Sequence, residues 1–313
     1  MAESVDQLGL LIVASPPGYR PRQVISIDTT MKAAGVNRAL AREVLQVLNQ
    51  KRLVELRPRV GATIRPVEQW DVFDPEVIRW RLKVAPRFQM RSLTEVREAI
   101  EPKAAYLAAT RASADVCRDL VSLNRELRRL GQDRTFEERG EAGQAWRAQY
   151  QEVDVEFHRT LLKGSQNEML HALADPVEEA LRYRIEEDWD GAKDLAEDDA
   201  DQQEGRGGLG TGGNRRFPQR PYEPALWLHH GLAHSVERGL PEAAETYSRA
   251  ILAEVREGPL HSLLCIALRQ SLDQLDPPKR LDPTGAEATE WETFRRTILT
   301  LADRQSAARK EGI

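Results

Sequence analysis

Long apolar runs, a signal-like start and paired cysteines are all missing from this sequence. No stretch approaches the roughly 20 consecutive apolar residues that a membrane-spanning helix needs, and residues 1–19 carry acidic side chains where a signal peptide has a basic segment. The two cysteines, Cys117 and Cys265, lie far apart and outside any metal-binding spacing. These absences predict a cytoplasmic chain without a membrane partner, whose thiols stay reduced.

The charge is unevenly spread along the 313 residues, although the net value is only −5. Residues 1–66 contain ten Lys and Arg against five Asp and Glu, whereas the remainder contains 35 basic and 45 acidic side chains. A basic first segment ahead of an acidic body is typical of a chain whose first domain binds a polyanion. The chain is long enough for two domains, and its 41% of hydrophobic residues are enough to form buried cores.

Three short helices and a β-hairpin are predicted within the first 67 residues. Gly35 follows the second helix at a position typical of a helix C-cap, and Asn37 is suited to cap the third. Pro58 and Gly61 mark a turn between two short apolar-rich segments, as in a hairpin. The helices are expected over 6–14, 26–34 and about 37–51, and the strands around 53–56 and 62–64. This order of elements predicts a winged helix-turn-helix.

The third predicted helix has one apolar and one basic side. At 3.6 residues per turn, Arg38 and Arg42 project together on the side opposite the apolar stripe, where Leu45 is an exception. The stripe consists of Leu40, Val44, Val47 and Leu48. Guanidinium groups presented in this way fit a major groove, where they contact phosphates or grip guanine. The same pattern is also typical of an ordinary solvated helix face.

Arg57 and Arg59 precede the predicted turn and would lie on the wing. In a winged helix-turn-helix, such side chains reach the neighbouring phosphate backbone or the minor groove. Together with the basic helix face, they make duplex DNA the expected partner of the first 67 residues.

The segment GVNRALAREVLQVLNQKRLVELRPRVGATIRP, residues 35–66, resembles the pattern GVSRTxVREALxxLxxxGLVExRPxxGxxVxP of the GntR family of transcriptional regulators. The resemblance implies that Arg38 and Arg42 are DNA contacts of a recognition helix and that Gly61 is the wing tip. The DNA-contacting residues predicted from both lines of reasoning are Asn37, Arg38, Arg42, Arg57, Arg59 and Gly61.

Two positions depart from the family pattern. Asn37 replaces the usual serine but still suits a helix N-cap. Asp28 stands where the family often has an arginine that touches phosphate. The resemblance therefore implies weaker DNA binding or a shifted operator preference for this chain.

From Trp70 onward the sequence is helical almost throughout, which predicts a mainly α chain. The predicted helices cover 74–82, 92–110, 113–130, 140–163, 167–186, 224–238 and 241–256. An acidic and then glycine-rich stretch at 197–224 interrupts them and predicts a mobile insertion of about 190–223. After residue 257 the sequence predicts a tail with one or two helices.

Three segments of this body resemble the FCD effector domain of one GntR subfamily: SLTEVREAIEPKAAYLAATRAS (92–113), VDVEFHRTLLKGSQNEML (153–170) and HHGLAHSVERGLPEAAE (229–245). The resemblance implies an N-terminal winged helix-turn-helix followed by an all-α helical-bundle effector domain that binds a small carboxylate. A homodimer is expected, because paired DNA half-sites need paired reading heads. The predicted domains are a DNA-binding domain at 1–67, a linker and helix at 68–91, an FCD-like ligand-binding domain at 92–257 and a tail at 258–313.

A metal-binding pattern lies within the FCD-like region. Asp154 and His158 are one helical turn apart, so both side chains can bind one cation, and a second helix bringing His229 would complete three protein ligands. The resemblance implies that such a site helps to grip the effector through one divalent ion such as zinc. The same resemblance places a further histidine at the position of Ile251. An Asp–His pair at this spacing is also typical of a plain hydrogen-bonded pair on a helix surface.

Arg97 is the predicted clamp for the carboxylate, because a guanidinium can bind both oxygens at once. An ordinary salt bridge with Glu101 is the alternative. Residues 69–82, QWDVFDPEVIRWRL, resemble the same segment of sugar-acid-responsive family members, which implies an aldonate or related hydroxy acid as effector. The predicted effector-binding residues are Arg97, Asp154, His158 and His229.

The favoured function is a ligand-responsive transcriptional regulator, most simply a repressor, and the chain is not predicted to be an enzyme. Two alternatives stay open. A metal-dependent hydrolase would use Asp154, His158 and His229, but it lacks an evident general base apart from Glu156, which points away from that face. A helical scaffold protein would use its winged helix to bind another protein instead of DNA.

Overall fold

The computed structural model describes residues 1–57, 61–133, 135, 140–183 and 223–257. The chain divides into two compact units, Met1–Leu93 and Thr94–Ile313. The insertion predicted at about 190–223 and the tail predicted at 258–313 lie outside the described residues, as do Pro58 and Arg59 of the predicted wing.

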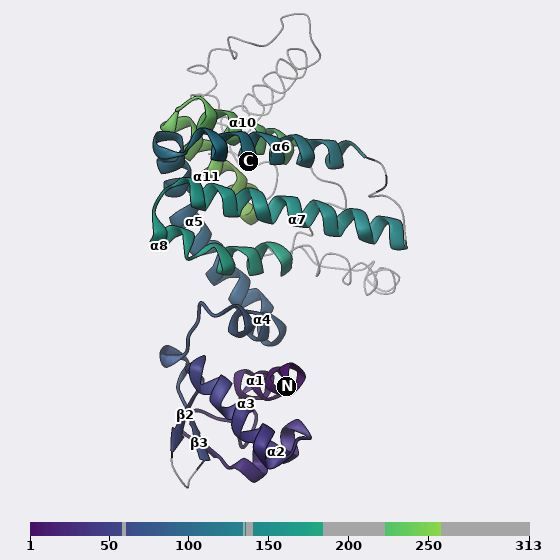
Figure 1. Ribbon diagram of the computed structural model, residues 1–313, viewed down its shortest axis with the longest axis vertical. Coiled ribbons are helices and arrows are strands. Elements are labelled where there is room, and N and C mark those ends of the chain that lie inside the picture. Colours follow the sequence, from purple (N-terminus) through teal and green to yellow (C-terminus); the bar gives the residue numbers. More distant parts are fainter. Residues whose placement is uncertain (58–60, 134, 136–139, 184–222, 258–313) are drawn as a thin grey trace, which may run out of the picture. The chain divides into compact units, whose positions relative to one another are not determined.

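Three helices open the first unit (Figure 1): α1 (Ala2–Ala14), α2 (Ile27–Ala34) and α3 (Arg38–Gln50). The Ser26 side chain accepts a hydrogen bond from the Thr29 backbone N–H at 3.0 Å and so begins α2. Asn37 begins α3 in the same way, with the Leu40 N–H as donor. Gly35 ends α2 in the left-handed conformation, at φ 63°. The three predicted helices are therefore confirmed, although α1 begins earlier than expected.

A three-stranded antiparallel sheet completes the winged helix-turn-helix. It consists of β1 (Val24–Ile25), β2 (Val54–Arg57) and β3 (Gly61–Ile64), in the order β1-β3-β2. Strands β2 and β3 form the predicted hairpin, in which Val54 pairs with Ile64. The strand β1 is a finding of the structure, because two residues are too short to show an alternating pattern.

The apolar side of α3 packs into the core of the first unit. Val44, Leu45 and Leu48 are at most 2% exposed and join apolar residues of α1, the sheet and α4. The prediction that Leu45 lies on the polar side is wrong, because the buried stripe runs from Ala41 at i, i+3, i+4 and i+7 and so includes it. Two residues expected in the stripe, Leu40 and Val47, are half-buried at its edges.

Helix α4 (Pro75–Val84) belongs to the first unit and is fastened to α1 and α3. The Trp80 indole is 1% exposed, and its Nε1–H donates a hydrogen bond to Asp6 Oδ1 at 2.9 Å. The ring also packs against Gly9, where an added Cβ would lie 2.7 Å away. The Asp74 side chain begins α4 and accepts a bond from Lys51 Nζ, just past the end of α3, at 2.8 Å. The helix that follows the wing is therefore part of the first unit's core.

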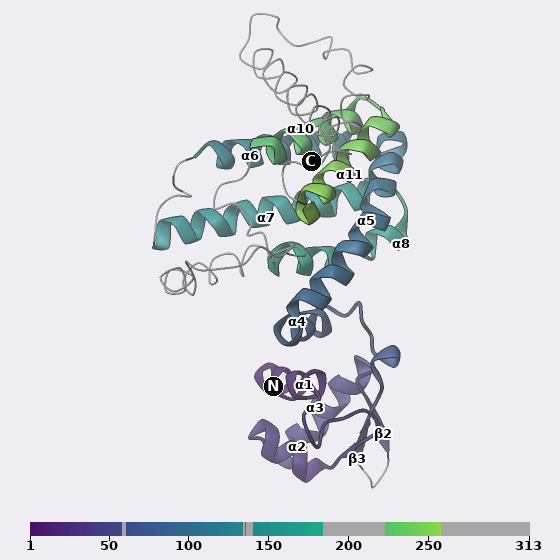
Figure 2. The same ribbon diagram turned by 180° about the vertical axis from the view of Figure 1, so that it is seen from behind.

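The second unit is a bundle of helices (Figures 1 and 2). Its described helices are α5 (Pro86–Arg111), which begins in the first unit, α6 (Ala114–Gln132), α7 (Glu141–Gly164), α8 (Glu168–His171), α10 (Glu223–Glu237) and α11 (Pro241–Glu257); residues 174–183 are also helical. Helix α6 lies beside α7 and α10, and α10 lies beside α11. Their apolar faces share one core, and the predicted all-α second part of the fold is confirmed. No helix in the described ranges combines the length and the hydropathy that a membrane span requires.

The single helix predicted over 167–186 is broken after His171. A proline within a continuous helix would lack a donor and clash with the carbonyl four residues earlier. The chain turns first and resumes as a helix at Ala174, so that Pro176 falls in the first turn, where its missing N–H is not needed.

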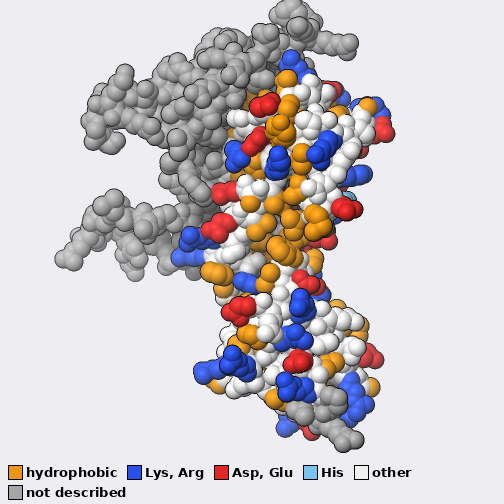
Figure 3. All heavy atoms as spheres, turned by 90° about the vertical axis from the view of Figure 1, so that its left-hand side faces the viewer, with side chains coloured by type: hydrophobic (Ala, Val, Ile, Leu, Met, Phe, Trp, Pro, Cys, Tyr) orange, Lys and Arg blue, Asp and Glu red, His pale blue; other side chains and the backbone are white. Residues whose placement is uncertain are grey.

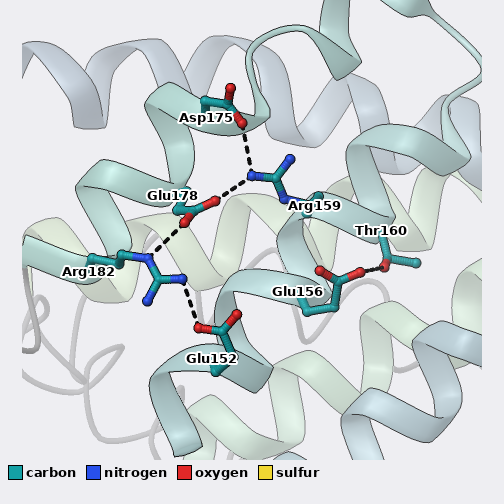
Figure 4. Close-up of polar contacts among 7 residues, drawn as sticks. All are labelled: Glu152, Glu156, Arg159, Thr160, Asp175, Glu178 and Arg182. Carbon is teal, nitrogen blue, oxygen red and sulfur yellow. Dashed lines mark hydrogen bonds and ion pairs between the residues drawn. The ribbon is translucent and has the colours of Figure 1, made fainter. Parts of the chain in front are cut away.

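Ion pairs hold the helical residues 174–183 against α7 (Figure 4). Arg159 of α7 lies 2.9 Å from Asp175 and also pairs with Glu178. Arg182 lies 2.8 Å from Glu178 and 2.7 Å from Glu152 of α7. Glu178 therefore receives a guanidinium from each side.

Candidate functional site

The basic side of α3 is at the surface of the first unit. Arg38 and Arg42 are both exposed, opposite the stripe that packs into the core. Arg38 Nη2 lies 3.0 Å from Asp28 Oδ1 in the first turn of α2, and these two side chains are 53% and 71% exposed. Arg42 has no ion-pair partner within the described part of the chain. Two guanidinium groups thus stand one helical turn apart, where a polyanion can reach them.

Of the predicted wing residues, the structure describes Arg57 and Gly61. Arg57 ends β2, is 58% exposed and lies 3.4 Å from Glu55. Gly61 pairs with Arg57 at the start of β3, and its φ of 121° favours glycine. An added Cβ would lie 2.4 Å from the carbonyl oxygen of Ile25 in β1. The close approach of β1 to β3 therefore explains this glycine without any DNA contact.

The second unit brings the three predicted metal ligands together. Asp154 and His158 come from α7 and His229 from α10, and one ligand atom of each lies within 4.8 Å of the others. Asp154 Oδ1 is 3.3 Å from His229 Nε2 and 3.9 Å from His158 Nε2. Both imidazoles are buried, at 2% and 5% exposure. One carboxylate oxygen and two imidazole nitrogens thus converge on one place inside the bundle.

The far side of each imidazole faces an oxygen acceptor. His229 Nδ1 lies 2.7 Å from the carbonyl oxygen of Ala225. His158 Nδ1 lies 2.8 Å from Glu101 Oε2, at the distance of an ion pair although not aligned as a hydrogen bond. An acceptor at Nδ1 keeps the proton there and leaves the Nε2 lone pair for a cation, as is usual around metal-binding histidines. The orientation of both rings therefore fits a divalent ion beside Asp154.

Glu101 joins this centre to Arg97, the predicted carboxylate clamp. Arg97 Nε lies 2.5 Å from Glu101 Oε1, one turn along α5, and both side chains are almost fully buried. Burial alone would raise the pKa of Glu101, but the charge of Arg97 and the interaction with the His158 ring outweigh burial and bring the pKa to about 2. Arg97 is thus engaged in the salt bridge considered as its alternative role. The sequence predicts Glu101 only as an alternative partner of Arg97, whereas the structure also places it beside His158.

Comparison with known proteins finds one domain family and several relatives that are similar to this chain. Residues 92–203 match the family model of the FCD domain. The chain is thus similar to FCD domains over these residues, and its curated relatives are transcriptional regulators. It is 31% identical over 157 residues to the galactonate operon transcriptional repressor of Escherichia coli, a match that covers 50% of this chain and 62% of the repressor. Its identity to the uncharacterized HTH-type transcriptional regulator YieP of Escherichia coli is 28%, over 50% of this chain and 64% of that protein.

The chain spans less than two thirds of the length of those two curated relatives. A solved structure of a Streptococcus agalactiae GntR protein is also similar, with a TM-score of 0.40 and 19% identity over 82% of this chain and 98% of that one. Both curated relatives are named as transcriptional regulators, which favours the prediction that the chain is not an enzyme over the hydrolase alternative.

Asp154, His158 and His229 could together hold one metal ion. Ile251, which stands where the family resemblance places a further histidine, is 5% exposed and packs in the apolar core. It offers no ligand atom. An oxygen with two imidazole nitrogens suits zinc or a similar divalent ion, and a set of three leaves room for a ligand from outside the chain.

Proposed function

We propose that this chain is a ligand-responsive transcriptional repressor whose first unit binds operator DNA. The supporting observation is the exposed basic side of α3, where Arg38 and Arg42 stand clear of the core within a winged helix-turn-helix. Helices of this kind enter the major groove of duplex DNA, and exposed guanidinium groups there contact phosphates and guanine edges.

Selection from a pool of random duplexes with the full chain tests this proposal. A preferred sequence should emerge, with affinity that falls as salt rises, because binding to phosphates releases counterions. Arg42→Ala should weaken binding to the selected duplex by about tenfold or more. Arg87→Ala removes the same charge from an exposed position on α5 and serves as the matched control. Equal affinities for the two variants would place the reading surface elsewhere.

The effector proposal rests on the polar centre of the second unit. Asp154, His158 and His229 would hold a divalent ion, which supplies a Lewis-acidic position for a carboxylate when it is bound. Glu101 and Ala225 hold the two imidazole rings in the orientation that such binding needs. The galactonate operon repressor is a relative, and a sugar acid or hydroxy acid is accordingly the effector class that we propose.

A thermal-shift screen of the full chain against sugar acids, with and without divalent ions, tests the effector. A cognate acid should raise the melting temperature, because a ligand that binds only the folded state stabilises it by mass action. His158→Ala should remove that rise, whereas His171→Ala, at an exposed position of α8, should keep it. A cognate shift that survives in His158→Ala would exclude the polar centre as the binding site.

The same proposal includes a homodimer, because paired DNA half-sites require two DNA-binding units. It also includes a cytoplasmic location. Figure 3 shows hydrophobic side chains gathered on one face of the second unit, as is common at protein–protein contacts. Light scattering of the full chain should give twice the mass of one chain. The mass of a single chain at micromolar concentration would contradict the dimer.

A further inference from the structure

The ion pair between Asp28 and Arg38 puts an acid on the side of the first unit that carries the exposed arginines. Asp28 lies in the first turn of α2, and Arg38 is the first residue of α3. Asp28 Oδ1 lies 3.0 Å from Arg38 Nη2, and more than half of each side chain is exposed. Ion pairs this exposed contribute little to folding stability. The pair therefore calls for an explanation at the surface rather than in the core.

Asp28 changes what Arg38 can bind. The carboxylate occupies one of the two terminal nitrogens of the guanidinium and holds the group on one side. A phosphate brought to Arg38 would carry its negative charge close to Asp28, and like charges repel. A base edge carries no net charge. Guanine offers two acceptors, O6 and N7, to the remaining donors of an arginine, and a nearby carboxylate can accept a hydrogen bond from cytosine N4.

Arg42 provides the contrast within the same helix. It is exposed one turn further along α3, and no ion pair engages it in the described ranges. Without a carboxylate partner among the described residues, Arg42 can bind a phosphate through strong charge-assisted hydrogen bonds. The two arginines thus present different chemistry to the same duplex.

We propose that Asp28 is a specificity-determining residue, which holds Arg38 toward a guanine edge and keeps it from binding phosphate. This inference rests on the proposed DNA-binding function of the first unit. Asp28 lowers affinity for DNA in general and raises the preference for one base pair. Arg38 reads sequence, and Arg42 supplies affinity through the backbone.

Random-duplex selection with the full chain, followed by salt titrations of the selected and a scrambled duplex, tests the role of Asp28. Asp28→Asn should bind the scrambled duplex several-fold more tightly, and the slope of log K against log salt should steepen by about one, the value for one added phosphate contact. Its preference for guanine at one position should fall by about tenfold. Asp71→Asn, at an exposed position outside α2 and α3, is the matched control.

Arg38→Ala tests whether Asp28 acts through Arg38. It should lose the same guanine preference, and adding Asp28→Asn to it should change neither the selected sequence nor the salt slope. If the full chain binds the duplexes but Asp28→Asn behaves like Asp71→Asn, Asp28 does not determine specificity and only this inference falls. If the full chain selects no duplex, the proposed DNA-binding function falls with it.

Discussion

Glu101 and His158 face each other inside the second unit, with Glu101 Oε2 2.8 Å from His158 Nδ1. The other oxygen of Glu101 lies 2.5 Å from Arg97. A carboxylate outside the proposed ligand set therefore links α5 to α7 and orients a ring that belongs to the set. Glu101 is therefore expected to affect both the stability of the bundle and the geometry of the polar centre.

Replacing Glu101 should destabilise the chain strongly. Arg97 is 2% exposed, and Glu101→Ala would leave its charge buried without this carboxylate. Breaking a buried ion pair in this way costs about 3–5 kcal/mol of unfolding free energy. Glu101→Gln keeps the shape and should cost less than Glu101→Ala. Urea unfolding of the full chain gives the values.

The matched control for that prediction is Asp115→Ala. Asp115 pairs with Arg118 at the start of α6, but these side chains are 79% and 70% exposed. An exposed pair contributes about 0–1 kcal/mol. Similar losses of unfolding free energy in Glu101→Ala and Asp115→Ala would show that the buried Glu101–Arg97 pair contributes no more stability than an exposed pair.

A divalent ion should stabilise the chain through Asp154. At a concentration about 100 times its Kd, an ion that binds only the folded state adds roughly 2.7 kcal/mol. Zinc should therefore raise the melting temperature of the full chain, and a chelator should reverse the rise. Asp154→Ala should abolish the response, and Asp119→Ala, at an exposed position on α6, should keep it. An equal zinc response in both variants would refute the proposed ligand set.

Local signals in the sequence account for most of the fold. Asn37 predicts the start of α3, because the side chain of an N-cap residue accepts a hydrogen bond from a backbone N–H only three residues further along the chain. Gly35 predicts the end of α2 for a similarly local reason, since it adopts a left-handed conformation. Such signals need no knowledge of distant residues.

Contacts between distant residues explain what the sequence does not predict. The need for glycine at Gly61 comes from Ile25 in β1, and the burial of Leu45 comes from packing against other elements. The polar centre is intermediate: the spacing of Asp154 and His158 is visible in the sequence, and the family resemblance supplies His229. No local sequence pattern predicts that Glu101 lies beside His158, because the two residues belong to different helices.

Gly9→Ala should destabilise the first unit, although this substitution usually favours a helix. Glycine within a helix costs roughly 0.5–1 kcal/mol relative to alanine. Here the added Cβ would lie 2.7 Å from the Trp80 ring, which is 1% exposed. Overpacking of this kind costs about 1–3 kcal/mol, so the net effect on unfolding free energy should be a loss.

A double-mutant cycle checks the origin of that loss. In a Trp80→Leu background the ring is absent, and Gly9→Ala should become neutral or stabilising. Trp80→Leu alone should also destabilise, because it removes a buried ring and its hydrogen bond to Asp6. If Gly9→Ala costs the same in both backgrounds, contact with Trp80 is not the cause. Chemical unfolding of the four proteins gives the comparison.

Glu178 should make part of the stability depend on pH. Burial would raise its pKa, but hydrogen bonds and charges from Arg182 and Arg159 outweigh burial and lower the pKa below its ordinary value (Figure 4). The folded-state pKa is thus below that of the unfolded chain, near 4.3. The contribution of Glu178 is therefore complete above about pH 5 and is lost as the pH falls toward the folded-state pKa.

Glu178→Gln separates this charge effect from simple loss of packing. Near neutral pH it should lower the unfolding free energy by about 1 kcal/mol, a value that allows for screening by solvent. The gap to the unchanged chain should narrow as the pH falls below about 4, because protonation removes the same charge from the original carboxylate. Glu126→Gln, which removes an exposed pair with Arg129, should show a smaller gap near neutral pH. A gap for Glu178→Gln that stays constant in acid would mean that packing, not the two guanidinium groups, explains the stabilisation.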